Sequence, residues 1–537
     1  MREPQFSLLW LIAPPEPRLM RQKLREQGLQ SQTSLWRLAR SAKLAPMTTP
    51  LRALFATKPL EELQQEHETS PLKRVLSVWD LIALGIGAII GAGIFATVGT
   101  AAAGDAARPG AGPGIVLSFL LTAAVCGLAA LCYAEMAAMV PIAGSAYTYA
   151  YATLGELAAW IIGWDLIIEY AVGNVAVAIS WSGYFCELLR GLGITIPPWA
   201  STDLRTALAS PEILAAAPKV AGIPIVVNLP AMGIVLLLTW LLVRGVRESA
   251  RTNAVMVILK LAVLLFFVVV GLFYVQPENY RPFLPNGFRG VWAGAAIVFF
   301  AYIGFDAVST AAEECRNPAR DLPRGILGSL VISTLVYVAV AAVVTGMVPA
   351  AELHTAEPLT VAMNRYHLGW ASGIVAVGSV AAHTAVLLVF QLGQPRIFFA
   401  MARDGLLPRA FAKVHHRYRT PHVTTILTGV VVAAFAGFAN IEEMVDLTNI
   451  GTLFAFALVS AGVVVLRHTN PQAPRPFRVP WSPLLPLASV VACLGLAAGL
   501  PRITWLRFAG WLALGLLVYL AYGRRHSLLR REAQNNR

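Results

Sequence analysis

The stretch Gly85-Ile86-Gly87-Ala88-Ile89-Ile90-Gly91-Ala92-Gly93-Ile94-Phe95 decides the fold of this chain. It lies inside an apolar segment long enough to cross a bilayer, and it holds four glycines within nine positions. Glycine is a poor helix former, and a helix that breaks inside lipid must find other partners for the backbone groups it frees. The sequence therefore predicts a membrane helix that is interrupted near its centre.

A second apolar segment carries a matching irregularity, Phe299-Phe300-Ala301-Tyr302-Ile303-Gly304-Phe305-Asp306. It lies five spans after the first, so the two segments cross the membrane in opposite directions and occupy equivalent places in two inverted repeats. Such paired interruptions indicate a transporter binding site, because half-helix N-termini attract anions and freed carbonyls attract cations. An amino acid carries both charges. The alternative for the first segment is a helix-packing motif, Gly87-x-x-x-Gly91.

The rest of the sequence fits an all-α membrane protein with twelve transmembrane helices. The 537 residues are 57% hydrophobic and only 13% charged, against roughly 25% charged in a soluble domain. Windows of roughly 20 apolar residues place the spans at Leu81–Ala103, Ile115–Val140, Leu157–Cys186, Ile223–Val243, Ala254–Val275, Val291–Ala312, Ile326–Val348, Trp370–Met401, Val423–Phe438, Met444–Leu466, Leu484–Leu500 and Phe508–Tyr522. We expect a 5+5 inverted-repeat transporter fold with discontinuous helices 1 and 6.

The spans divide the chain into four parts. Residues 1–75 form a cytoplasmic N-terminal tail, 76–275 the first repeat, 276–466 the second repeat, and 467–537 spans 11 and 12 with a cytoplasmic C-terminal tail. Residues 1–46 differ from the rest, and Met47 opens a stretch that reads as a natural beginning. An over-extended start and a disordered tail are both open for that segment.

The basic residues indicate how the chain is oriented. The net charge is +13, and of the 42 Lys and Arg residues 32 fall on the side of the termini and nine on the other side. The positive-inside rule therefore predicts a multi-pass protein of the cell (inner) membrane with both termini in the cytoplasm. Because the charge follows the loops and forms no single patch, it gives no reason to expect a nucleic-acid partner.

Motifs for catalysis or metal binding are missing from the sequence. The five cysteines form no CxxC pair, and there is no GxSxG, HExxH or phosphate-binding loop. We expect no enzyme activity, no catalytic residues, no metal and no cofactor. The partners we expect are an amino acid substrate, a proton and the lipid bilayer, with the chain a monomer or weak oligomer.

Charged residues inside spans are functional candidates by default. Lys260 lies nine residues past Arg251, roughly 13 Å along the helix, where it must find partners or lose its proton. It is a candidate proton carrier, with a fixed ammonium or a snorkelling stem as the alternatives. Asp165 and Glu169 share one face of span 3, and Glu169 is the deeper. The role of His383 in span 8 stays open between a satisfied core histidine and a proton relay.

Several blocks in order resemble the amino acid-polyamine-organocation superfamily, and within it a bacterial-type twelve-span member of the cationic amino acid transporter family. They are Gly87 to Phe95; Tyr133-Ala134-Glu135-Met136 with Pro141-Ile142-Ala143-Gly144-Ser145-Ala146-Tyr147; Gly163-Trp164-Asp165-Leu166-Ile167-Ile168-Glu169-Tyr170; Phe299 to Glu314; and Gly393-Gln394-Pro395-Arg396 with Ala402-Arg403-Asp404-Gly405-Leu406-Leu407-Pro408. The resemblance runs from about Pro50 to about Leu466 and is weaker beyond.

The resemblance implies a substrate held at the bilayer centre between spans 1, 3, 6 and 8. The carboxylate would meet backbone amides around Ile89, Ile90, Gly91, Ala92 and Gly93. The substrate ammonium would meet carbonyls of Phe300, Ala301 and Ile303, with the Glu169 carboxylate facing the pocket. Lys260 matches the family's fifth-span lysine, which takes the place of a sodium ion and fits proton coupling. Phe390 departs from the family pattern, and its bulk at the pocket floor would disfavour long side chains such as arginine.

Together these features predict a secondary active amino acid permease that imports its substrate by proton-coupled symport and alternating access. One alternative is an exchanger or facilitator without proton coupling. Another is a nontransporting membrane sensor, for which the short cytoplasmic tails offer little support. The sequence does not tell which amino acids are carried.

Overall fold

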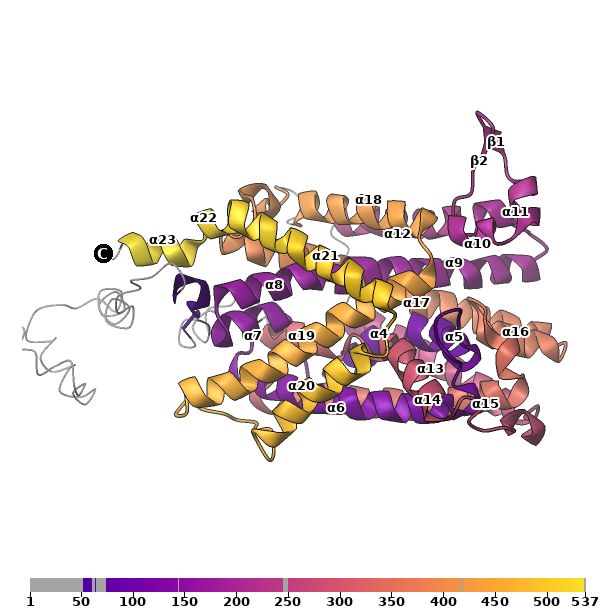
Figure 1. Ribbon diagram of the computed structural model, residues 1–537, viewed down its shortest axis with the longest axis horizontal. Helices are drawn as coiled ribbons and strands as arrows, with labels where there is room; N and C mark the ends of the chain where they lie inside the picture. The colour runs from indigo at the N-terminus through magenta and orange to yellow at the C-terminus, as the bar shows by residue number, and fades with distance from the viewer. Residues whose placement is uncertain are drawn as a thin grey trace, which may run out of the picture. The chain divides into compact units, whose positions relative to one another are not determined.

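The apolar windows of the sequence become long helices joined by short connections (Figure 1). The computed structural model describes residues 52–59, 63, 74–142, 144–244, 250–416, 418 and 420–535. The predicted tail segment 1–46 lies outside these residues.

The helices are α4 (Val78–Ile89), α5 (Val98–Ala103), α6 (Ile115–Met139), α7 (Ser145–Thr153), α8 (Glu156–Ile167), α9 (Gly173–Gly191), α10 (Leu204–Leu208), α11 (Pro211–Ala216), α12 (Leu229–Val243), α13 (Ala250–Leu272), α14 (Gly287–Val298), α15 (Pro318–Met347), α16 (Pro358–Arg365), α17 (Gly369–Arg403), α18 (His422–Phe438), α19 (Ile441–Thr469), α20 (Leu484–Ala497), α21 (Arg502–Val518), α22 (Arg524–His526) and α23 (Leu528–Asn535).

Membrane-crossing length is reached by most of the predicted spans. Within the described residues, eight helical stretches are long and apolar enough to cross a bilayer, and the bent pair Val78–Ile89 with Gly93–Ala103 makes a ninth if counted as one span. Three further apolar helices, α12, α18 and α20, are shorter. The chain is therefore a multi-pass helical membrane protein, while the number twelve stays a prediction.

A small antiparallel pair of strands was not expected in an all-α chain. Strands β1 (Lys219–Val220) and β2 (Ile223–Pro224) pair with Lys219 opposite Pro224. They belong to the long connection between α9 and α12, which also contains the short helices α10 and α11. Figure 1 shows these elements with α16 at one end of the helices, and α7 and α22 at the opposite end.

Two units appear in the chain, Phe55–Leu528 and the terminal segments Met1–Leu54 with Leu529–Arg537. In the terminal unit, the described residues comprise Arg52 to Leu54 of a short 3-10 turn and the part of α23 from Leu529 onward. In the larger unit, α15 packs against α6 and α4, α17 against α9 and α13, and α19 against α20. All of the site described below belongs to the larger unit.

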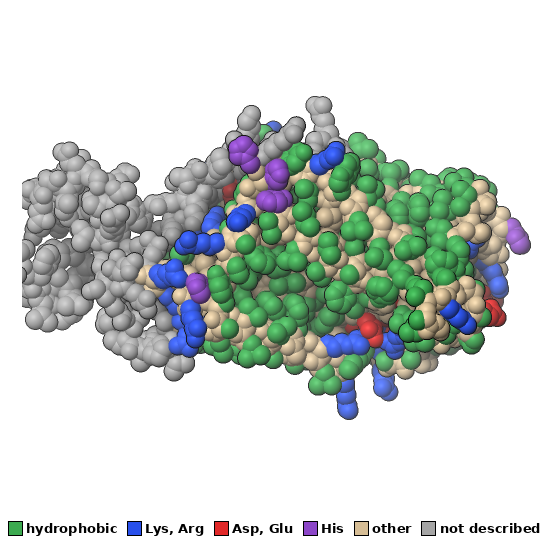
Figure 2. Space-filling model, turned by 90° about the horizontal axis from the view of Figure 1, so that it is seen from above, with side chains coloured by type: hydrophobic (Ala, Val, Ile, Leu, Met, Phe, Trp, Pro, Cys, Tyr) green, Lys and Arg blue, Asp and Glu red, His purple; other side chains and the backbone are tan. Residues whose placement is uncertain are grey.

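The face of the larger unit seen in Figure 2 is covered by hydrophobic side chains over its middle, with Lys and Arg gathered toward its ends. Helix α13 shows the same division within one element, because Val255, Ile258 and Leu265 are exposed whereas Lys260 and Phe267 are fully buried. An exposed apolar face is what a helix presents to lipid. Lys260 therefore lies on the protein-facing side of its helix, and a snorkelling stem does not describe it.

Helix α21 is joined to α8 by a pair of stacked tryptophans. The rings of Trp164 and Trp511 lie 4.7 Å apart and nearly parallel, and each indole N–H donates to the other residue's carbonyl, at 2.9 and 3.2 Å. One turn away, the indole of Trp160 donates to the carbonyl of Gly515 at 2.9 Å. The last apolar helix is thus attached to the first half of span 3.

A buried carboxylate at the start of α8 bonds to residues on either side of α22. Glu156 is fully buried and accepts hydrogen bonds from the hydroxyl of Tyr519, at 2.8 Å, and from the hydroxyl of Ser527. Its backbone N–H donates to the carbonyl of Ala56 at 3.0 Å. Segments near both ends of the larger unit therefore converge on the start of α8.

We expect Trp511→Ala to lower the thermal stability of the purified protein, since a stacked aromatic pair contributes about 0.5–1.5 kcal/mol beyond its buried area. Trp370→Ala is the matched control, because Trp370 is 62% exposed. Scanning fluorimetry in detergent would measure both variants. Equal melting temperatures for Trp511→Ala and Trp370→Ala would contradict the assigned role of the tryptophan pair.

Candidate functional site

The first interruption lies where the glycine-rich stretch predicts it. Helix α4 begins at a capping box between Ser77 and Asp80 and ends at Ile89, and Ile90 is extended, with φ −79° and ψ 104°. The chain resumes as a π-helical turn, Gly93–Thr97, that leads into α5, and the two halves are bent by 42°. The predicted discontinuity of span 1 is confirmed.

The second interruption has a different form. Helix α14 is followed by a 3-10 turn, Phe299–Tyr302, then by extended Ile303 and by Gly304 with φ +114°, before a second 3-10 segment, Phe305–Glu314. A positive φ of this size is readily adopted only by glycine. The predicted discontinuity of span 6 is therefore also present, and Gly304 is the residue that permits it.

Glycines let the two interruptions lie directly against each other. A Cβ atom at Gly93 would stand 2.1 Å from the Cα of Ala301, and one at Gly304 would stand 2.9 Å from the backbone of Ala88. On another side of the first break, a Cβ at Gly91 would stand 2.7 Å from a methyl of Val386 in α17. Spans 1 and 6 therefore meet at the breaks with backbone in contact, and a side chain of span 8 packs against the first break.

Tyr337 of α15 bridges the two interruptions, and sequence reasoning did not single it out. Its hydroxyl lies 3.0 Å from the carbonyl oxygen of Ile89 and 2.8 Å from that of Ala301. Tyr337 is fully buried, as is Tyr302, whose ring lies 5.4 Å away. The only signal in the sequence is a lone tyrosine in an otherwise aliphatic stretch of span 7. A phenolic proton placed between two freed carbonyls reduces the cost of burying them.

The ammonium of Lys260 satisfies two further carbonyls of the first break. Nζ donates to the carbonyl oxygens of Gly87 and Ile90, both at 2.8 Å. Gly87 is in the last turn of α4, and Ile90 is the extended residue after it. Backbone carbonyls are the ligands that a small cation would take at the same place, so the lysine occupies a cation-binding position of the interrupted helix.

The backbone N–H groups that the first break frees lie at the start of the second half of span 1. The amide of Ile90 donates to Ile86 at 3.0 Å and is used within α4, whereas the first bond of the next turn is from Phe95 to Gly91, at 3.4 Å. The N–H groups of Gly91, Ala92 and Gly93 lie between these two bonds, where the regular helical pattern of backbone hydrogen bonds is interrupted. Together they form the N-terminal end of a half-helix, which attracts anions.

Span 3 has an irregularity of its own at Glu169. A π-helical turn, Ile168–Val172, separates α8 from α9, and Glu169 in it is buried at 3% exposure. Single π turns occur often at functional sites. The neighbouring carboxylates differ in their surroundings: Asp306 accepts from the hydroxyl of Ser145 at 3.3 Å, while among the described residues neither oxygen of Asp165 has a hydrogen-bond partner.

Phe390 lies against span 3. Its ring is buried and lies 5.6 Å from that of Tyr170, edge to face, and a Cβ atom at Gly173 would stand 3.1 Å from its Cε2 atom. The next residue, Gln391, accepts from the side-chain amide of Asn174 and donates to the hydroxyl of Thr239, both at 2.6 Å. The bond to Asn174 holds α17 against α9 beside the position of Phe390.

His383 is bonded on both sides of its ring. Nδ1 lies 2.7 Å from the carbonyl oxygen of Ser379 and Nε2 lies 2.7 Å from the hydroxyl of Ser180. A carbonyl oxygen accepts only, so Nδ1 carries the proton, and Nε2 then accepts from Ser180 in the neutral ring. This geometry matches a satisfied core histidine that joins α17 to α9.

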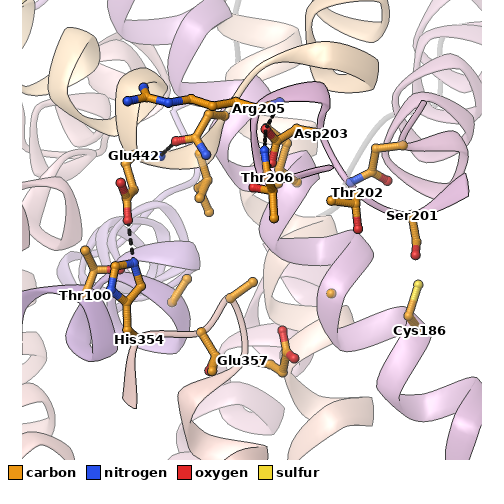
Figure 3. Close-up of a pocket in the computed structure, with 18 of the residues that line it drawn as sticks. Thr100, Cys186, Ser201, Thr202, Asp203, Arg205, Thr206, His354, Glu357 and Glu442 are labelled. Atoms are coloured by element: carbon orange, nitrogen blue, oxygen red, sulfur yellow. Dashed lines mark hydrogen bonds and ion pairs between the residues drawn. The ribbon is translucent and has the colours of Figure 1, made fainter. Parts of the chain in front are cut away.

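A cavity of about 660 Å³ opens beside α10 and α16 and reaches the second half of span 1 at Ala96 and Thr97 (Figure 3). It also touches Ile297, near the end of α14. This volume is within the usual range for small-molecule sites, roughly 300–1,000 Å³. The cavity therefore leads toward the two interruptions from the end of the unit that lies away from α7 and α22.

Comparison with known proteins agrees with this architecture. Residues 76–516 match the amino acid permease family. A methylthioribose transporter of Bacillus subtilis is 46% identical over 480 residues, covering 89% of this chain and 100% of the relative. The branched-chain amino acid permease BcaP of the same organism is 47% identical, covering 89% of this chain and 99% of the relative.

More distant relatives are found in eukaryotes. The vacuolar cationic amino acid transporter 4 of Arabidopsis thaliana is 38% identical over 410 residues, which are 75% of this chain and 64% of that protein. These relatives are carriers, and the matched region contains both interrupted helices and Lys260. The chain belongs to the amino acid permease family of membrane transporters.

Proposed function

We propose that this protein imports an amino acid together with a proton by alternating access. The observation that carries the proposal is the meeting of two interrupted helices, whose half-helix amides and freed carbonyls can take the two charges of a zwitterion. The membrane arrangement we propose is twelve spans with two inverted repeats of five in the cell membrane and both termini in the cytoplasm. The nine long and three shorter apolar stretches, and the bias of Lys and Arg, support it.

The proposed substrate position follows from which backbone groups remain available. The carboxylate would bind at the amides of Gly91, Ala92 and Gly93, which start the second half of span 1. The ammonium would bind at the carbonyls of Phe300 and Ile303, while the carbonyl of Ala301 shares its lone pairs with Tyr337. The amides of Ile89 and Ile90, which the family resemblance also placed at the carboxylate, stay outside the proposed position, because Ile89 ends α4 and the amide of Ile90 donates to the carbonyl of Ile86.

Glu169 and Phe390 would border the substrate side chain. Both are buried, and both lie on the spans that flank the breaks, Glu169 on the π turn of span 3 and Phe390 on α17. A large ring at this place would favour substrates with short or compact side chains. The relative named as a branched-chain amino acid permease fits this expectation, and the one named as a methylthioribose transporter adds a thioether sugar to the compounds worth testing.

Lys260 is the group we propose for proton coupling. Its ammonium is stabilised while the carbonyls of Gly87 and Ile90 face it. If alternating access moves the first break away from α13, the ammonium loses these acceptors in a buried site, where the neutral amine is favoured. Release of the proton would then be tied to movement of span 1, which is the requirement for coupling.

The first alternative is an exchanger or facilitator in which Lys260 is a permanent cation. Uptake into proteoliposomes with and without an imposed pH gradient decides between the two mechanisms, since only the coupled carrier accumulates substrate in response to the gradient.

A thermal-shift screen of the purified protein against the twenty amino acids and methylthioribose should first identify the ligand, because ligands that bind the native state stabilise it. Ligand binding without flux in the same vesicles would favour a sensor.

Lys260→Ala should abolish uptake driven by a pH gradient and retain measurable substrate binding, because the proposed binding groups belong to the backbone. Lys219→Ala is the control, since Lys219 is an exposed residue of β1. Counterflow and gradient-driven uptake in proteoliposomes measure the two activities. Gradient-driven accumulation at the wild-type level in Lys260→Ala would rule out the coupling role.

Tyr337→Phe should slow uptake by about tenfold or more, because leaving buried carbonyls unpaired costs about 1–3 kcal/mol, and 1.4 kcal/mol is a factor of ten. The control is Tyr280→Phe, which removes a hydroxyl that donates to the carbonyl of Ala342 in the same helix, away from the breaks, at 2.8 Å. Initial rates at matched protein amounts give the comparison. A similar loss in both variants would indicate a general effect on α15.

Phe390→Ser should widen the range of side chains that compete for uptake, because it replaces a buried ring by a small hydroxyl. The cavity left behind will also cost stability, so Phe390→Leu serves as a milder variant with less lost volume. The measurement is a competition profile across the twenty amino acids. An unchanged profile in both variants, with uptake preserved, would place Phe390 outside the substrate pocket.

A further inference from the structure

The charged side chains that line the cavity beside α10 and α16 all have a partner, with one exception. Three arginines and four carboxylates line it. Six of these seven groups have partners. The arginines form ion pairs: Arg108 with Asp446 at 2.7 Å, Arg190 with Glu187 at 2.7 Å, and Arg205 with Glu443. Of the other two carboxylates, Asp203 accepts from the hydroxyl of Thr206 at 2.6 Å, and Glu442 lies 2.8 Å from Nε2 of His354. The seventh group is Glu357.

The Glu357 side chain faces the cavity, and its carboxylate has no hydrogen bond or ion pair with any residue in the described part of the chain, whereas its backbone carbonyl accepts from the hydroxyl of Thr360 and the amide of Val361. Figure 3 shows its carboxylate pointing into the cavity, whereas dashed lines join His354 to Glu442 and Asp203 to Thr206. The residue precedes α16 and is half-buried. A carboxylate in such a place forgoes part of its hydration with no protein partner to replace it.

The fold makes room for this carboxylate on α9. A Cβ atom at Gly183 would stand 2.9 Å from Oε2 of Glu357, so a larger residue at 183 would push the side chain away. Burial raises the pKa of Glu357, repulsion from Glu187 raises the pKa further, and Arg190 opposes both effects. A cation in the cavity would offset the effects of burial and of repulsion from Glu187, and would keep the carboxylate ionised.

We propose that Glu357 anchors an ammonium-binding site in this cavity, where the amino group of the substrate is held before it reaches the interrupted helices. The inference rests on the proposed amino acid transport. A single carboxylate in a cavity that Thr97, Thr100 and Thr355 also line matches a primary ammonium, which has a single charge and donates three hydrogen bonds. A divalent cation would require more oxygen ligands than a single unpaired carboxylate supplies.

Cys186 provides a reporter that does not depend on transport. It lines the same cavity, and it is the one cysteine within the described ranges that is not buried. In full-length protein, the rate at which Cys186 reacts with a cationic methanethiosulfonate, relative to an anionic one of similar size, measures the local potential. Mass spectrometry identifies the modified residue.

Glu357→Gln should lower the cationic-to-anionic rate ratio about fivefold, because removing one unit charge about 8 Å away in water changes each of the two rates about twofold, in opposite directions. The amino acid identified by thermal shift should slow modification in the wild type and lose this effect in Glu357→Gln, while its N-acetyl derivative should not protect either protein. Glu352→Gln is the matched control, because Glu352 is an exposed carboxylate of the same connection, 3.4 Å from Arg365. Gly183→Ala keeps the charge but displaces it, and should reduce protection even if Glu357→Gln does not fold.

Three results would overturn the inference: an equal rate ratio in Glu357→Gln and the wild type, protection by the N-acetyl derivative, or protection by sodium or potassium chloride alone at matched ionic strength. The outcomes separate the site from the proposed function. Normal uptake with no effect of Glu357 on Cys186 defeats only the site. Protection that depends on Glu357 in a protein with no flux defeats only the transport mechanism.

Discussion

The contact between two broken helices is the constraint on which the rest of this structure depends. Inside a bilayer, backbone groups freed by a break have no water to bond to. Here each break covers the other, with Gly93 against Ala301 and Gly304 against Ala88, and four carbonyls at the breaks are met by one phenol and one ammonium. Neither break would be tolerable without the partners supplied by the other spans.

The elements around the breaks are held together in a different way. Spans 3 and 8 are joined by side-chain hydrogen bonds, Asn174 to Gln391 and Ser180 to His383, and span 3 is joined to α21 by reciprocal tryptophan bonds. The first two bonds join side chains of regular helices. The tryptophan bonds run from each indole N–H to the backbone carbonyl of the other tryptophan. The carbonyls freed at the breaks, in contrast, are met by one side chain each from α13 and α15. The proposed alternating access would use this difference, since a movement of the breaks would need to exchange only the few hydrogen bonds to Lys260 and Tyr337.

The sequence predicted the features of this site that arise from local chemistry. Four glycines in span 1 and one in span 6 predicted the breaks because glycine is unfavourable in a helix, and Lys260 was found because a charge is costly in lipid. Tyr337 was missed because a tyrosine in an apolar span has no unusual local cost. The π turn at Glu169 and the partners of Gln391 were also missed, because both depend on packing between spans that are far apart in the sequence.

The position of Lys260 also offers a way for it to be coupled to the proposed substrate site. Its ammonium bonds the carbonyl of Ile90, and the next amides, beginning at Gly91, are those that would take the substrate carboxylate. One peptide unit therefore separates the ammonium of Lys260 from the proposed anion site, and the field of this ammonium favours a carboxylate there. When the carboxylate is present, it stabilises the charged lysine in turn, since this linkage is reciprocal. Substrate and proton would thus bind together more readily than either alone, which would favour the doubly loaded carrier that symport requires and needs no direct contact between them.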